Sequence, residues 1–265
     1  MILEGVSPVG WLLAAAAAAA YAVLALAARR IGSEQARRVM LLAWVLHGAL
    51  LAWDLLHGQP HFGFAQALSI TVWLVLTAYV VESRLYPQMR ARWALAGFGA
   101  VTVLLSVLFP GAALPATTSP LLPLHWALGI AAYGLMAAAV VHGGMMNRLE
   151  RQMRQRRPAR PEDGGGVPLL TLERLMFRFV GAGFVLLTLT MLVGLFFGGG
   201  GAWRWDHKRV FTLLSWLVFA VLLAGRWWLG WRGRRAVHML YAGSVLLLGS
   251  AGSRFVLEVL LGRTP

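Results

Sequence analysis

PVGWLLAAAAAAAYAVLALAA, residues Pro8–Ala28, is an apolar stretch without a single charged side chain. A bilayer core of about 30 Å is crossed by roughly 20 apolar residues in helical form, and this stretch has that length. The first charged side chain of the sequence is Glu4, whereas a signal peptide begins with a basic region. The stretch is therefore predicted to be a retained first membrane helix, whose alanines allow close helix packing.

Seven further stretches meet the same test within a few residues at each end. Together with the first, the predicted spans are 8–28, 39–56, 64–81, 93–109, 124–146, 175–197, 210–228 and 236–260. Strands are not expected, because the apolar runs are continuous and open sheet edges cannot face lipid. The predicted fold class is all-α: a polytopic bundle of about eight transmembrane helices. It forms a single integral membrane domain over 1–265 with a cytoplasmic basic loop at 147–174.

Composition leads to the same class of protein. The chain has 265 residues, of which 59% are hydrophobic and only 13% are charged. A soluble domain of this length would need more polar surface to stay dissolved. Cysteine is absent, which excludes a disulfide framework and a thiolate metal site, so the seven histidines are the good nitrogen ligands of the sequence.

The basic residues behind the formal net charge of +14 are not spread evenly along the sequence. Most of the basic residues lie in four alternate connections: Arg29, Arg30, Arg37 and Arg38; Arg84, Arg90 and Arg92; Arg148, Arg151, Arg154, Arg156, Arg157, Arg160, Arg174 and Arg178; Arg226, Arg232, Arg234 and Arg235. The positive-inside rule then places both termini outside the cytoplasm. This topology accounts for the charge without nucleic acid, which is not an expected partner. Arginines of the segment 148–166 either contact anionic membrane lipid or are simply solvated.

Two histidines in or beside spans are candidates for function, because ionisable groups in a bilayer are costly. His47 lies mid-span and shares a helical face with Trp44, Leu51 and Asp54. It is either a ligand or a neutral imidazole hydrogen-bonded between helices. His125 opens a span on the non-cytoplasmic side, where a neutral imidazole could ligate a metal or haem iron or could be merely amphipathic.

The connection Gly198–Arg209 reads GGGGAWRWDHKR. If it is extended, Trp203 and Trp205 project to the same side, with Asp206 and His207 next to them. The indoles are either an interfacial aromatic belt or a shelf for a flat hydrophobic macrocycle. In another outer loop, His57 and His61 have HxxxH spacing, but Pro60 argues against the helix that a metal site would need.

Several of these motifs resemble the cytochrome c assembly proteins, which handle haem with a tryptophan-rich loop. The resemblance covers roughly 120–260 and is closest to the small YpjD-type inner-membrane proteins of that superfamily. It is carried by the following motifs: WRWDHK (Trp203–Lys208), SWLVF (Ser215–Phe219), GWRGRRA (Gly230–Ala236), His125 with Ala132, Tyr133 and Gly134, and Gly252–Val256. His47 extends it, since these proteins carry a histidine in the second helix.

The resemblance implies a function and a ligand set. In the family the loop binds haem on the outer face, histidines supply axial ligands, and haem passes towards apocytochrome c. It therefore implies haem b bound by Trp203, Trp205 and Asp206, with His125 and either His47 or His207 on the iron. Arg209 stands where the family loop usually has Glu, and the second outer histidine must be His207, His57 or His61.

The leading hypothesis is thus a multi-pass protein of the bacterial inner membrane that binds haem. It would transport or chaperone haem, or assist other cytochrome c assembly or membrane proteins. The alternatives are a structural or regulatory subunit that retains the fold, and a small-solute transporter using Asp54, Glu82 or Arg178. An enzyme is not expected, because no nucleophile–base pair or phosphate loop occurs.

Overall fold

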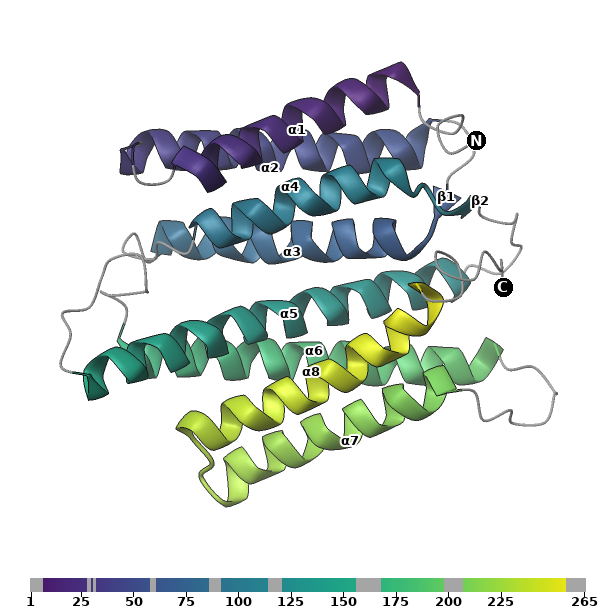
Figure 1. Ribbon diagram of the computed structural model, residues 1–265. Coiled ribbons are helices and arrows are strands. Elements are labelled where there is room, and N and C mark those ends of the chain that lie inside the picture. The colour runs from purple at the N-terminus through teal and green to yellow at the C-terminus, as the bar shows by residue number, and fades with distance from the viewer. Residues whose placement is uncertain are drawn as a thin grey trace. The chain divides into compact units, whose positions relative to one another are not determined.

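The computed structural model describes residues 7–27, 30, 32–57, 61–85, 92–113, 121–155, 168–197 and 207–255 (Figure 1). Its helices are α1 (Pro8–Ala27), α2 (Ser33–Leu56), α3 (Phe64–Leu85), α4 (Arg92–Leu108), α5 (Leu121–Arg154), α6 (Leu169–Phe197), α7 (His207–Trp228) and α8 (Gly233–Phe255). Two short strands, β1 (His61–Phe62) and β2 (Ala112–Ala113), complete the described elements. Each predicted span overlaps one of these helices, and the prediction of a helical membrane protein is confirmed.

Six of the described helices are long and apolar enough to cross a membrane: α1, α2, α3, α5, α6 and α7. The apolar helix α4 has 17 residues and is shorter than this group. Helix α8 has Arg234, Arg235 and Arg254 within its bounds, which lowers its apolar character. The count of eight spans remains a prediction.

Helical structure extends into the predicted basic loop 147–174 from both sides. Helix α5 continues to Arg154, and α6 starts at Leu169. Arginine and glutamate are good helix formers, and the i,i+4 pair of Glu150 and Arg154, 3.0 Å apart, supports the last turn of α5. Helix bounds predicted from apolar residues alone therefore fall short of the observed end of α5 and the observed start of α6.

The two strands are a departure from the expectation that strands are absent. His61 pairs with Ala113 and Phe62 with Ala112 in an antiparallel register. Gly111, at φ +79°, makes the turn into β2, and a Cβ there would lie 2.7 Å from the backbone nitrogen of Gly63. The pair joins the segment after α2 to the segment after α4.

The chain divides into two compact units, Met1–Pro115 and Ala116–Pro265, called here the N-terminal unit and the C-terminal unit. In the N-terminal unit, α1 packs against α2 and α4, and α3 packs against the same two helices. Small side chains permit close approach: Ala14, Ala17 and Ala18 of α1 are buried, as is Ala96 of α4. Large apolar side chains such as Leu26, 88% exposed, point outward as lipid-facing groups do.

The C-terminal unit repeats this arrangement with α5 to α8. Helix α5 packs against α6 and α8, and α7 packs against the same two helices. Ring stacking of Phe184 on Trp216, with centroids 5.3 Å apart, joins α6 to α7. The Trp216 Nε1–H donates to Thr188 Oγ1 at 2.9 Å, so this contact also satisfies the polar atom of the indole.

Candidate functional site

His125 lies in the second turn of α5, at the interface with α6. Pro123 is tolerated just before it, because the first turn of a helix has unpaired N–H groups in any case. The imidazole is half-buried, and its Nδ1 lies 2.9 Å from the carbonyl oxygen of Thr190 on α6. Gly194, one turn further along α6, makes room for the ring, since a Cβ there would lie 3.1 Å from His125 Cε1.

This hydrogen bond fixes the tautomer of His125. A carbonyl oxygen can only accept, so Nδ1 carries the hydrogen and the lone pair lies on Nε2. Metal-bound histidines are held in the same manner, with one ring N–H donated to a carbonyl or carboxylate and the other nitrogen facing the metal. The arrangement of His125 therefore fits a ligand of haem iron, which needs one or two protein nitrogens.

Within the C-terminal unit, the starts of α5 and α7 and the ends of α6 and α8 lie on the same side (Figure 1). Lys208 lies in the first turn of α7. Ser250 of α8 donates to the Lys208 carbonyl oxygen at 3.2 Å, and its Oγ lies 2.8 Å from Thr212 Oγ1. A hydroxyl cluster thus joins the start of α7 to α8.

The connection 198–206 between α6 and α7 carries Trp203 and Trp205 and is called here the tryptophan-rich segment. Trp203, Trp205 and Asp206 lie outside the described residues, and His207 is described only as the first residue of α7. The last residue of α6, Phe197, is three residues beyond Gly194, a rise of about 4.5 Å along a helix. The segment is therefore attached within one helical turn of the groups that hold His125.

His47 is fully buried in the N-terminal unit. Its Nε2 lies 2.9 Å from Ser69 Oγ of α3, and its Nδ1 lies 3.4 Å from Tyr21 Oη of α1. The Tyr21 ring also meets the imidazole edge-on, with centroids 5.8 Å apart. Because a neutral imidazole has one donor and one acceptor nitrogen, one hydroxyl accepts from it and the other donates to it. His47 therefore joins three helices through side-chain hydroxyls.

The predicted stripe of Trp44, His47, Leu51 and Asp54 is only partly a buried face. Trp44 stacks on Trp73 of α3, with centroids 5.4 Å apart, and the Trp73 Nε1–H donates to the Trp44 carbonyl oxygen at 3.0 Å. Asp54 is exposed near the end of α2. The carboxylate thus does not contribute to the buried polar cluster around His47.

The HxxxH pair is not helical. Helix α2 ends at Leu56, His57 stacks on the Trp53 ring with centroids 3.6 Å apart, and His61 belongs to β1. Within the described ranges, no group of three or more histidine or acidic residues is placed to hold a metal ion.

The sequence of this chain is similar to those of known membrane and cytochrome c assembly proteins. The sequence model described as "Cytochrome C assembly protein" matches residues 33–261. This chain belongs to the cytochrome c assembly protein family. "Inner membrane protein YpjD" of Escherichia coli K12 is 33% identical over 144 residues, 54% of each chain. "Cytochrome c biogenesis protein CcsA" is 38% identical over 80 residues in Trichormus variabilis and 36% in Gloeothece citriformis. Those matches cover 29% of this chain and 23% and 24% of the CcsA chains.

In this member of the cytochrome c assembly family, the residues that hold the two histidines were not identified from the sequence. Tyr21 is the one aromatic side chain within Ala14–Ala28, and a polar aromatic in a run of alanines is a pattern that could have identified it. Ser69 and Gly194 have no comparable pattern, because serine and glycine are common in membrane helices. The carbonyl of Thr190 has no side-chain signature at all.

Proposed function

We propose that this protein binds haem in the bacterial inner membrane and transports or chaperones it, or assists cytochrome c biogenesis as an accessory factor. His125 Nε2 would hold the iron, with His207 as the second nitrogen ligand. His47, the other candidate, belongs to the N-terminal unit, and both of its ring nitrogens lie at hydroxyl groups. Trp203, Trp205 and Asp206 contact the macrocycle. The bound group is haem b, held without a covalent link, and the chain performs no catalysis of its own.

The observation that carries this proposal is the hydrogen bond of His125 to Thr190. It fixes the lone pair on Nε2 of His125, on α5, next to the last two turns of α6, the helix from which the tryptophan-rich segment continues. Haem supplies an iron centre whose behaviour depends on its axial ligands and on the polarity of the surroundings. Family membership, and relatives whose names refer to cytochrome c biogenesis, support the same function.

The proposed topology has eight spans, a single membrane domain and both termini on the non-cytoplasmic side. It follows from the distribution of arginines, and places the haem site on the outer face. Membrane lipid, haem and other cytochrome c assembly or membrane proteins are the proposed partners. A C-terminal fusion to an alkaline phosphatase, which folds only outside the cytoplasm, should be active. An active cytoplasmic reporter at the same position would contradict this topology.

An absorbance spectrum of the purified protein tests haem binding directly. The protein, as isolated or after addition of haemin, should show a Soret band that weakens strongly in His125→Ala. His238→Ala is the matched control, because His238 is exposed in α8 and lies in the same unit. A colourless protein that takes up no haemin would contradict the proposal, as would an equal loss in both variants.

A second test concerns the position of His125 rather than its chemistry. Gly194→Val places a side chain where the His125 ring lies, so haemin affinity should fall while every proposed ligand is retained. Gly181→Val in the same helix is the control, because no atom lies within 4 Å of a Cβ at that position. Equal haemin affinity in the two variants would show that the α6 contact does not position the ligand.

The second candidate function is a structural or regulatory membrane subunit without haem. It is favoured by the two hydroxyl partners of His47, which are those of a packing residue. In that case, His125→Ala and His47→Leu would alter neither the spectrum nor the haem content of the membrane. A Soret band that depends on His125 would exclude it.

A further inference from the structure

A hollow between α2 and α3 lies at the arginine-bearing ends of these helices. It is lined by Arg37, Met40, Leu41, Tyr79, Val80, Ser83 and Arg84, and its volume is about 30 Å³. This volume is enough for one or two water-sized groups and is far too small for a macrocycle. All of its lining residues belong to the N-terminal unit, so it is separate from the groups around His125.

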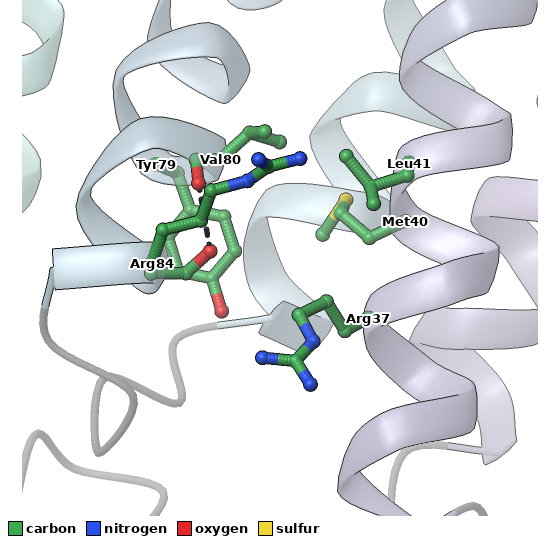
Figure 2. Close-up of a pocket in the computed structure, with 7 residues that line it drawn as sticks. Arg37, Met40, Leu41, Tyr79, Val80 and Arg84 are labelled. Carbon is green, nitrogen blue, oxygen red and sulfur yellow. Dashed lines mark hydrogen bonds between the residues drawn. The ribbon is translucent and has the colours of Figure 1, made fainter.

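Two guanidinium groups stand at this hollow, one from each helix. Figure 2 shows Arg37 on α2 and Arg84 on α3, with Tyr79 on α3 also lining the hollow. Both arginines are exposed, and among the described residues neither has a carboxylate within ion-pair distance. The neighbouring Arg38 differs, because it pairs with Glu34 at 2.5 Å. Glu82, the acidic residue of α3, does not line the hollow.

Next to these two charges, the hollow is lined by the apolar side chains of Met40, Leu41 and Val80. On α2, Arg37, Leu41 and Val45 follow one another at i, i+4 and i+8, so they form one stripe along the helix. Val45 is 54% exposed, and so is Val81 on α3, the residue after Val80 in the sequence. Two cationic side chains therefore lie at the ends of these helices, and exposed apolar side chains follow them along the helices. This arrangement is complementary to a ligand in which a phosphate carries acyl chains.

We propose that the Arg37–Arg84 hollow is a binding site for the phosphate headgroup of an anionic phospholipid. The two guanidinium groups hold the phosphate, which arginine can bind through paired N–H donors. The acyl chains run along Leu41 and Val45. Basic pockets between membrane helices are the usual place for anionic headgroups. Free inorganic phosphate would leave the apolar stripe of Leu41 and Val45 uncovered, whereas a phospholipid covers it.

Native mass spectrometry of the full chain in detergent, with added dioleoyl phosphatidylglycerol, tests the proposal. In the R37Q/R84Q variant, the lipid concentration for half-occupancy should rise about 25-fold, because each basic residue at the surface contributes about five-fold to anionic lipid binding. R38Q is the matched control: its guanidinium is already paired and exposed, so the shift should stay below about two-fold. Because Arg37 and Arg84 are exposed, the single variants R37Q and R84Q provide the same test if the double variant does not fold.

Two comparisons separate the lipid from other ligands. Dioleoyl phosphatidylcholine has the same acyl chains without net charge and should bind far more weakly. Inorganic phosphate at the same concentration should not displace the bound lipid. Equal binding of the two lipids, displacement by phosphate, or unchanged binding in R37Q/R84Q would each overturn the proposal.

Discussion

His47 and His125 are the same residue type placed in two different kinds of surroundings. His47 is fully buried, and side-chain hydroxyls from two other helices lie at both of its ring nitrogens. His125 is half-buried at a helix end, where a backbone carbonyl fixes one nitrogen as the donor. The first arrangement joins helices and the second orients a lone pair. The partners of an imidazole, rather than its depth in the membrane, therefore indicate what it does.

The largest effect is expected for His47→Leu. Loss of the imidazole leaves the hydroxyls of Tyr21 and Ser69 buried without their shared partner, which should lower the free energy of unfolding by about 2–3 kcal/mol. Unfolding with sodium dodecyl sulfate, followed by tryptophan fluorescence, measures this. His57→Ala, a change at an exposed histidine of the same unit, should cost far less. Equal costs would mean that the hydroxyl cluster does not stabilise the unit.

A smaller effect is expected where Tyr21 packs against α4. A Cβ on Gly99 would lie 3.0 Å from the Tyr21 ring, so Gly99→Val must displace the partner of His47. Overpacking of this kind should cost about 1–2 kcal/mol in the same unfolding assay. Gly97→Val is the control on the same helix, since a Cβ there meets no atom within 4 Å. A Gly97→Val cost as large as that of Gly99→Val would point to the loss of glycine itself rather than to Tyr21.

Ser69→Ala should have a lesser effect, because it removes one of the two hydroxyls at His47. Hydrogen bonds between membrane helices contribute about 0.6–1 kcal/mol each, and this is the expected loss in stability. Ser106→Ala is the buried control in the same unit, where the hydroxyl bonds to the Val103 carbonyl of its own helix. A larger cost for Ser106→Ala would contradict the role given to Ser69.

The smallest effect on stability is expected for His125→Ala. Its acceptor, the Thr190 carbonyl, is also the helical partner of the N–H of Gly194, so the loss should stay below about 0.5 kcal/mol. The same variant should have the greatest effect on haemin binding, and this contrast with His47 sharpens the comparison. An unfolding free energy lowered as much as in His47→Leu would mean that both histidines are packing residues.

The sequence predicts the helices well because apolar length is a local property. The predicted spans and the observed helices agree over most of their lengths, as at 8–28 and Pro8–Ala27. Agreement fails at 147–154 and 169–174, where charged residues continue the helix beyond the apolar stretch. The predicted ligands His125 and His47 were chosen on residue type. Their partners Thr190, Tyr21 and Ser69 lie on other helices, so only the packing of the helices brings them together.

The closed arrangement of α1 to α4 has a consequence for biosynthesis. Helix α1 contacts both α2 and α4, α3 contacts the same two helices, and β1 pairs with β2, all within the first 115 residues. Domains fold in the order in which the ribosome delivers them. The N-terminal unit can therefore complete its own contacts while α5 is still being translated. The half that carries His125 is then inserted second, after the N-terminal unit has assembled.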